Sequence, residues 1–211
     1  MIIMLASQKG GSGKTTIAVN LVSYLSLMGK DVILIDSDRQ GTASNWLFDR
    51  TENKDLPLVN GVQKYENIST SLKDFNRRYE YVIVDSPGRD SREMRTGMLS
   101  SNFILIPVRC SQPDLDTLTK MQEIVHEVRD MNPKVTVKGL LTMAPTNPAI
   151  TEIQEARDYV KDYPSIPFLS TIIFDRKVYR DSMSLGKSIA ELSNDKAKRE
   201  MESLVKEVFN A

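Results

Sequence analysis

Two lysines flank a glycine-rich stretch near the start of this 211-residue sequence, SQKGGSGKTT at residues 7–16. Its glycines are Gly10, Gly11 and Gly13. Glycine permits backbone conformations and a closeness of approach that side chains forbid, so successive N–H groups can form a concave nest for an anion. With a strand before it and a helix N-terminus after it, such a stretch is predicted to bind phosphate.

Lys14 and Thr15 carry the chemistry that this loop predicts. In a phosphate-binding loop, the lysine at this spacing reaches the β- and γ-phosphates, and the hydroxyl that follows ligates Mg²⁺. The strict pattern GxxxxGK[ST] would have a glycine at position 8, where this sequence has Gln8. The predicted nucleotide contacts are Gly10, Gly11, Ser12, Gly13, Lys14, Thr15 and Thr16.

Three aspartates follow hydrophobic segments and could complete a magnesium site. Asp36 and Asp38 lie in LIDSDRQG, and Asp85 ends YVIVD. The carboxyl ends of parallel strands meet at the edge of a sheet where ligands bind. A carboxylate at Asp85 can accept hydrogen bonds from Mg²⁺-bound water, and Gly88 is expected to be a switch that senses the γ-phosphate. Alternatively, Asp36 and Asp38 only cap a helix that starts near Thr42.

The elements that must position these residues follow from the hydrophobic pattern. Apolar runs that do not alternate with polar residues predict parallel strands covered on both faces, at 2–7, 31–36, 81–85, 103–108 and 137–143. Helical spacing predicts helices at 15–28, from an Asp114 cap to Val128, at 149–161 and at 196–209. One short strand is expected near 57–59. The alternation predicts an α/β, doubly wound, mostly parallel sheet with helices on both faces, in one domain spanning 1–211.

Composition limits the classes of partner and compartment. Lys plus Arg equals Asp plus Glu at 28 each, so any basic surface must be local. The single Cys110 excludes a disulfide framework and favours a reducing, cytosolic setting. No apolar run approaches the ~18 residues that span a bilayer, and the N-terminal residues lack the basic region of a signal peptide.

The motif KGGSGKTT resembles the deviant Walker A motif of the ParA/MinD ATPases. The resemblance implies that Lys9 enters the partner subunit and touches its nucleotide, as an arginine finger does. Alternatively, Lys9 is an ordinary solvated lysine at a strand end. LIDSDRQG resembles the family's DxDPQ motif, with Arg39 where proline is usual. By this resemblance Asp38 positions the attacking water and Asp36 supports the hydration shell of magnesium.

The resemblance therefore implies specific site residues and cofactors. The catalytic residues are Lys9, Lys14 and Asp38, and the magnesium site is Thr15, Asp36 and Asp85. The segment from Pro107 to Asp114 resembles a family loop that contributes to the dimer face and the nucleotide surroundings. No Asn/Thr-Lys-x-Asp guanine motif follows a late strand, so ATP with Mg²⁺ is expected rather than GTP.

The C-terminal part, 171–192, also resembles ParA. Because the loop starts at residue 9, leaving no room for an N-terminal DNA-binding domain, the resemblance is to the short plasmid partition type. It implies an ATP-dependent homodimer on the nucleoid in the cytoplasm, non-specific DNA binding, and weak hydrolysis stimulated by a centromere-binding adaptor. The expected DNA contacts form a basic strip within 176–199: Arg176, Lys177, Arg180, Lys187, Lys196, Lys198 and Arg199.

Two other classes remain open from the sequence. A MinD-like membrane-surface ATPase would place the apolar stripe of the last helix, from Met201 to Phe209, on a bilayer. Packing of such a stripe on the core is the more common arrangement, and the acidic residues of that helix oppose anionic lipid, so a membrane partner is not expected. A biotin-pathway ligase could carry the same phosphate loop, although Lys9 argues against it.

Overall fold

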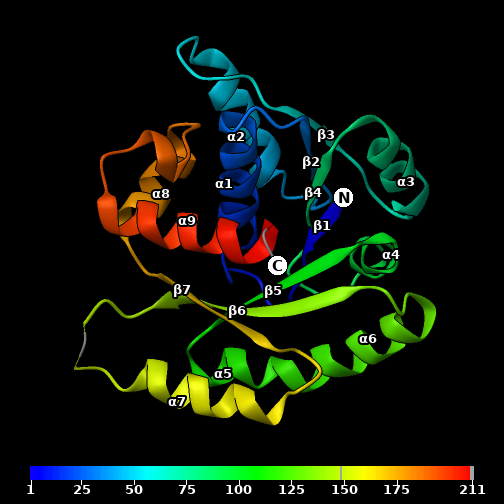
Figure 1. The fold of residues 1–211 in the computed structure, drawn as a ribbon, viewed down its shortest axis with the longest axis vertical. Helices are drawn as coiled ribbons and strands as arrows, with labels where there is room; N and C mark the ends of the chain where they lie inside the picture. Colours follow the sequence, from blue (N-terminus) through cyan, green and yellow to red (C-terminus); the bar gives the residue numbers. More distant parts are fainter. Residues whose placement is uncertain (148, 210–211) are drawn as a thin grey trace.

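The computed structural model describes residues 1–147 and 149–209, and their strands form one seven-stranded sheet. The strands are β1 (Ile2–Leu5), β2 (Val32–Asp36), β3 (Asn60–Gln63), β4 (Tyr81–Asp85), β5 (Phe103–Arg109), β6 (Thr136–Ala144) and β7 (Phe168–Phe174). All neighbours pair in parallel, in the order β3-β2-β4-β1-β5-β6-β7 (Figure 1). The predicted α/β fold with a parallel sheet is confirmed.

Helices cover both faces of the sheet (Figure 1). One face carries α1 (Lys14–Leu27), α2 (Thr42–Glu52), α8 (Lys177–Ser184) and α9 (Asp195–Phe209), with the short turn η2 (Ile189–Glu191). The other carries α3 (Ser69–Arg78), α4 (Arg92–Ser100), α5 (Gln112–Leu115), α6 (Thr117–Met131) and α7 (Glu152–Tyr159), which continues into η1 (Val160–Asp162).

Strand β1 shows why the central strands are apolar throughout. Ile2 and Met4 enter the hydrophobic cluster on one face, while Ile3 and Leu5 enter the cluster on the other. Successive side chains of a strand point to opposite faces, so a strand covered on both sides must be apolar at every position. This places the polar residues of the central strands at their ends, where the candidate site lies.

The structure contains elements that were not predicted, namely β7, α3, α4 and α8, and it differs from two explicit expectations. The short strand predicted near 57–59 is wrong in position, because β3 occupies Asn60–Gln63, an edge strand with three exposed residues and no apolar run. The expected Asp114 cap is also wrong, because Asp114 lies inside α5 and α6 begins at Thr117. Ser111 precedes α5, and Pro113 occupies its first turn, where proline is tolerated.

The apolar stripe of α9 is part of the core. Met201, Leu204, Val205 and Val208 are buried in the cluster that also holds α1. Packing of this stripe on the core is therefore confirmed, and the alternative in which it lies on a bilayer is wrong, because the chain's own sheet and helices already cover it. Among residues 1–147 and 149–209, no helix is long and apolar enough to span a membrane.

A buried ion pair ties α2 to the segment before α9. The Arg50 side chain is 1% exposed and donates to both carboxylate oxygens of Glu191, at 2.9 and 2.7 Å. It also donates to the carbonyls of Pro57 and Gly186. Since Arg50 and Glu191 satisfy each other's charge in the interior, removing one partner leaves the other charge unpaired.

Arg50→Ala is therefore expected to lower the free energy of unfolding by about 3–5 kcal/mol in urea titrations, because it leaves Glu191 without its partner. Arg77→Ala, on the exposed side of α3, is the control and should change stability by less than about 0.5 kcal/mol. A loss below about 1 kcal/mol in Arg50→Ala would show that the pair does not fasten α2.

Candidate nucleotide site

The register of the sheet brings the predicted carboxylates together. Asp36 at the end of β2 pairs directly with Asp85 at the end of β4, and Asp85 pairs with Leu5 at the end of β1. The phosphate loop begins immediately after β1 and ends where α1 starts at Lys14. Three adjacent strands thus deliver the two aspartates and the loop to one edge of the sheet, as expected.

The loop has the backbone conformation that its glycines predict. Gly11 has φ of +76° and Gly13 has φ of +87°, both in the left-handed region that favours glycine. Gly88 approaches the loop from β4, since a Cβ built on it would lie 2.5 Å from Cα of Gly10. No residue but glycine fits at position 88 without moving the loop. The loop after Asp85 therefore touches the phosphate loop directly, as a switch glycine requires.

Lys14 is held beneath the loop. Its side chain is largely buried, and its Nζ donates to the Ser7 hydroxyl at 2.8 Å and to the Lys9 carbonyl at 3.4 Å. Burial lowers the pKa of Lys14, while the charges of Asp85 and Asp38 act in the opposite direction. A cation placed in this way can neutralise an anion bound in the loop.

Asp85 and Thr15 meet where a cation would be held. The Thr15 hydroxyl donates to Oδ2 of Asp85 at 2.7 Å, and Oδ1 of Asp85 is buried and has no hydrogen-bond partner among the described residues. Burial raises the pKa of Asp85 to about 7. An orphaned carboxylate oxygen beside a hydroxyl is a donor set that suits Mg²⁺ and its bound water.

Asp36 and Asp38 differ in how they are engaged. Asp36 accepts hydrogen bonds from the backbone N–H and the hydroxyl of Ser44, at 2.8 and 2.6 Å, in the first turn of α2. Its other oxygen accepts from the backbone N–H of Asp38. Asp38 is half-buried and closes a turn by accepting from Gln40. The capping role is thus correct for Asp36, and both aspartates lie at the edge that holds the loop.

Lys9 has a partner within its own chain. Its Nζ lies 3.0 Å from Oδ2 of Asp114, and Ser111 donates its hydroxyl to the same oxygen. The Lys9 side chain is 46% exposed, whereas that of Asp114 is 6% exposed. Lys9 is thus the accessible end of this pair, while the buried Asp114 carboxylate is also held by the Ser111 hydroxyl.

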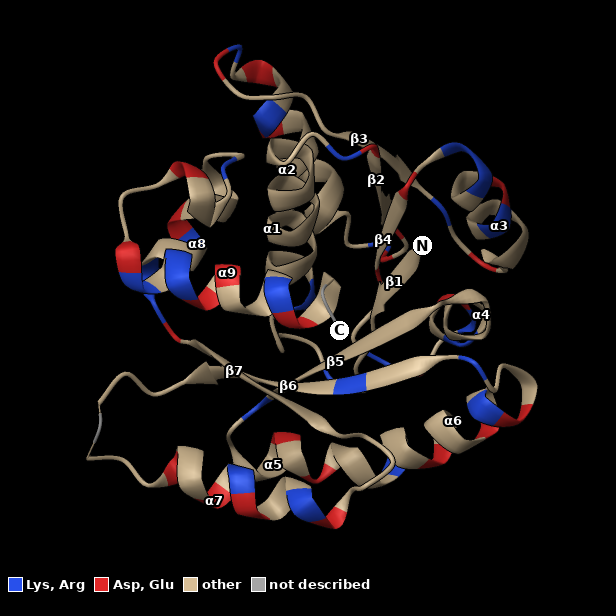
Figure 2. Cartoon of the chain, viewed as in Figure 1, with Lys and Arg blue, Asp and Glu red and all other residues tan. Residues whose placement is uncertain are grey.

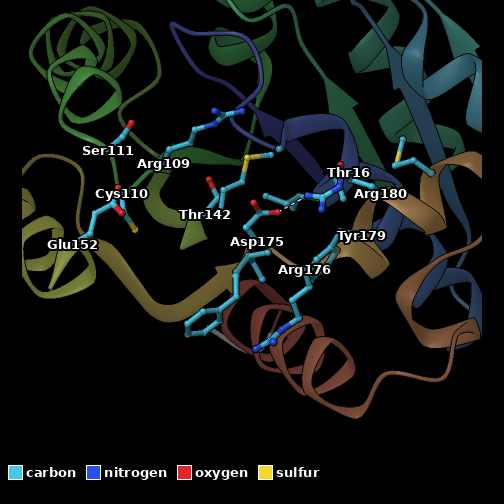
Figure 3. A pocket seen from close by; sticks show the side chains of 16 residues that line it. Thr16, Arg109, Cys110, Ser111, Thr142, Glu152, Asp175, Arg176, Tyr179 and Arg180 are labelled. Carbon is cyan, nitrogen blue, oxygen red and sulfur yellow. Dashed lines mark hydrogen bonds and ion pairs between the residues drawn. The ribbon is translucent and has the colours of Figure 1, made fainter. Parts of the chain in front are cut away.

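A cavity of about 560 Å³ adjoins the loop (Figure 3). Gly13 and Thr16 line it from the loop and α1, Arg109 and Thr142 from β5 and β6, and Tyr179 from α8. Its volume lies in the range of cavities that bind small molecules. The cavity therefore offers space for the nucleoside of a nucleotide whose phosphates occupy the loop.

The seven basic residues predicted to contact DNA do not form a continuous strip. Arg176 is paired with Glu200 at 2.6 Å, Lys177 with Asp181, and Arg180 with Asp175. Figure 2 shows acidic and basic segments interleaved on α8 and α9. The remaining members are Lys187, Lys196, Lys198 and Arg199.

Two residues that bind the loop were not among the predicted nucleotide contacts, although Arg109 lies in the segment from Pro107 to Asp114 that was expected near the nucleotide. Arg109, the last residue of β5, donates from Nε to the Gly11 carbonyl at 2.8 Å. Thr142, near the end of β6, donates its hydroxyl to the Ser12 carbonyl at 2.9 Å. Both lie near the carboxyl ends of parallel strands, at the edge of the sheet where ligands bind, and that position was the sequence signal that could have identified them.

The loop, the edge carboxylates and the parallel sheet together define a P-loop nucleotide-binding fold. The family profile described as "CobQ/CobB/MinD/ParA nucleotide binding domain" matches residues 3–189. The chain therefore belongs to the CobQ/CobB/MinD/ParA family of nucleotide-binding domains, as the resemblance indicated.

Similar proteins include a carboxysome distribution protein and a chromosome-partitioning ATPase. The chain is 30% identical over 191 residues to maintenance of carboxysome distribution protein A of Halothiobacillus neapolitanus, covering 90% of this chain and 87% of that protein. It is 27% identical over 218 residues to the chromosome-partitioning ATPase Soj of Thermus thermophilus, covering 90% and 87%. The structure of a Cyanothece McdA–ATP complex matches with a TM-score of 0.79 at 17% identity, covering 99% and 96%.

The buried state of Asp85 predicts a pH dependence of stability. Its pKa in the folded protein lies above the unfolded value near 3.9, so this group makes stability fall as pH rises from about 4 to about 7. Asp85→Asn should remove that fall and be more stable than the unaltered protein at pH 8, on the order of 1–4 kcal/mol.

This difference is measured by urea unfolding at pH 5 and pH 8, without nucleotide or divalent cations. Asp55→Asn, in an exposed loop, is the control and should follow the unaltered protein at both pH values. If Asp85→Asn instead destabilises the protein at pH 8, the carboxylate is not the uncompensated charge that its burial indicates.

Proposed function

We propose that the chain, acting as one domain over 1–211, is a ParA-type ATPase that distributes a cargo over DNA. In this proposal ATP drives formation of a homodimer, the dimer binds DNA without sequence preference, and an adaptor on the cargo stimulates hydrolysis. The observation that carries it is the position of Lys9 on the half-exposed flank of a complete phosphate loop. The partition ATPases among its relatives support the choice of process.

ATP and Mg²⁺ fit the residues of the site. The backbone N–H groups from Gly10 to Thr16 would hold the phosphates, with Lys14 as the counter-charge. Thr15, Asp85 and, through its bound water, Asp36 would hold the metal, whose chemistry is to neutralise charge on the phosphates. Among the described residues no three His, Cys, Asp or Glu side chains gather to bind a metal alone. The ion would therefore share its ligands with the nucleotide.

Lys9 would act across the dimer interface. Its side chain is half-exposed and so can turn toward a second subunit; Asp114 would then keep the hydrogen bond from Ser111, and a charge-assisted contact of Lys9 with a phosphate would have to offset the lost ion pair. Two loops that face each other would each supply a lysine to the other's nucleotide. Dimerisation would then complete the charge stabilisation that hydrolysis needs.

Asp38 would serve hydrolysis rather than binding. It lies near Lys14 and Asp85, close enough for its charge to affect the pKa of both, and within the described chain its hydrogen bonds go to its own turn rather than to the loop backbone. A half-buried carboxylate at this edge can orient a water for attack on the γ-phosphate. Its loss should leave the phosphate loop intact.

DNA binding would use the basic residues that carry no ion pair in the described chain: Lys187, Lys196, Lys198 and Arg199. Arg176 is largely buried against Glu200 and is left out of this surface. With a net charge of zero, a monomer makes few phosphate contacts, and a dimer doubles them. This would place the ATP form on the nucleoid in the cytoplasm.

Lys9→Ala and Asp38→Ala should have opposite effects on the ATP dimer. Lys9→Ala removes the contact between subunits, so the protein should bind ATP, remain a monomer and not hydrolyse it. Asp38→Ala keeps the charge stabilisation but loses water positioning, so it should accumulate as an ATP-bound dimer with hydrolysis reduced by about 100-fold or more. Light scattering with ATP and phosphate release provide the two readouts. A Lys9→Ala protein that dimerises and hydrolyses normally would refute the proposed function.

Replacing Lys196, Lys198 and Arg199 together by Ala should weaken binding of the ATP dimer to all DNA sequences alike. The log–log salt slope should fall by about 0.9 for each lost phosphate contact. A control triple on α3, with Lys73, Arg77 and Arg78 replaced by Ala, should leave both quantities unchanged. DNA affinity that does not depend on nucleotide, or that survives the α9 triple, would contradict this surface.

A further inference from the structure

Arg109 and Thr142 hold two successive carbonyls of the phosphate loop. These residues are direct partners in the register of β5 and β6. Arg109 donates to the Gly11 carbonyl at 2.8 Å, and Thr142 donates to the Ser12 carbonyl at 2.9 Å. Figure 3 shows both side chains at the wall of the cavity beside the loop. Neighbours in the sheet thus bind neighbours in the loop.

In the part of the chain that the structure describes, neither Arg109 nor Thr142 has a competing partner that would draw it away from the loop. A Cβ built on Gly11 would lie 2.8 Å from Nη2 of Arg109, so a side chain at position 11 would displace the guanidinium. Among the described residues, Arg109 forms no ion pair with an acidic side chain. Its fixed contact is the loop carbonyl. Thr142 is 1% exposed, so its hydroxyl has no alternative partner in water.

The backbone after Thr142 is strained. Met143 has φ of +49°, in the left-handed region that residues other than glycine rarely occupy, and the pairing of β6 with β7 shifts between Leu141 and Ala144. Such irregularities redirect side chains and occur at functional sites, where the surroundings compensate for a cost of order 1–3 kcal/mol. Here the irregularity accompanies the contact of Thr142 with the loop.

A peptide unit is planar and trans, so its C=O and the following N–H point in opposite directions. Fixing the Gly11 carbonyl toward Arg109 turns the N–H of Ser12 the other way, and fixing the Ser12 carbonyl toward Thr142 does the same for Gly13. These N–H groups belong to the predicted anion nest. The two side chains therefore determine where the donors of the nest point.

We propose that Arg109 and Thr142 are positioning residues that preset the phosphate loop for its nucleotide before the nucleotide arrives. The orientation of the loop is fixed without a ligand, so binding does not have to order it, and affinity rises accordingly. The affinity part of this inference rests on the proposed function, whereas the ordering of the loop does not. Neither residue needs to touch the phosphates.

The first experiment measures hydrogen–deuterium exchange of the loop peptide 7–16 in nucleotide-free protein. Thr142→Val removes the hydroxyl at nearly constant volume, and Thr142→Ser keeps it; Arg109→Met removes the donor and keeps the length. Each lost hydrogen bond should speed loop exchange by about 2- to 10-fold relative to amides of the central strands. Thr136→Val, on an exposed position of the same strand, is the matched control and should not change it.

The second experiment measures the Kd for Mg-ADP by calorimetry in the same proteins. Thr142→Val and Arg109→Met should raise the Kd by about 2- to 10-fold, while Thr142→Ser and Thr136→Val bind as the unaltered protein does. Unchanged loop exchange in Thr142→Val, or equal losses in Thr142→Val and Thr142→Ser, would overturn the proposal. So would faster exchange that extends to the whole sheet, since that is general destabilisation. If the unaltered protein bound no nucleotide, the proposed function would be refuted. The exchange experiment would still show whether Arg109 and Thr142 order the loop.

Discussion

The parallel register of β2, β4 and β1 is the constraint on which the site depends. Because Asp36, Asp85 and Leu5 are aligned at the strand ends, both carboxylates stand beside the loop that leaves β1. The strands can hold this register only if they are covered on both faces, which requires the two apolar clusters. Gly88 then closes the arrangement by packing directly on Gly10. A shift of one strand by one residue would separate these groups.

Charge in the candidate site is divided between buried and half-exposed groups. Asp85 is a fully buried acid whose pKa rises to about 7, and Lys14 is a buried cation whose pKa is lowered. Both groups carry a desolvation cost that a bound nucleotide and metal would offset. Lys9, by contrast, is half-exposed and held by Asp114 alone. This difference between a buried and a half-exposed lysine is the physical basis for assigning them to different subunits' nucleotides.

Much of this organisation could be predicted from the sequence. The central strands were predicted because they are buried on both faces and therefore unbroken in hydrophobicity, and the loop because glycine and lysine spacing has few other uses. Strand β3 was misplaced because an exposed edge strand such as Asn60–Gln63 carries no apolar signal. Asp114 was misread as a cap because its true partners, Lys9 and Ser111, include a residue 105 positions away.

Long-range pairing also explains what was missed at the site and on the surface. The place of Arg109 and Thr142 near strand ends could be predicted, but their contacts with the loop join residues 98 and 130 positions apart. The basic strip was predicted by counting charges within residues 176–199. Glu200, which pairs with Arg176, lies just outside that range, on α9. The sequence shows which residues are charged, but only the fold shows which of those charges are already paired.

The central claim is that Lys9 of one subunit completes the nucleotide site of the other. It is tested most directly by mixing two inactive variants, Lys9→Ala and Lys14→Ala, and measuring phosphate release from ATP. In a mixed dimer, the Lys9→Ala subunit retains its own Lys14 and receives Lys9 from its partner, so one of the two sites is complete. The account predicts that the mixture hydrolyses ATP although neither variant does so alone. A mixture that stays inactive, with both variants folded and the unaltered protein active, would contradict it.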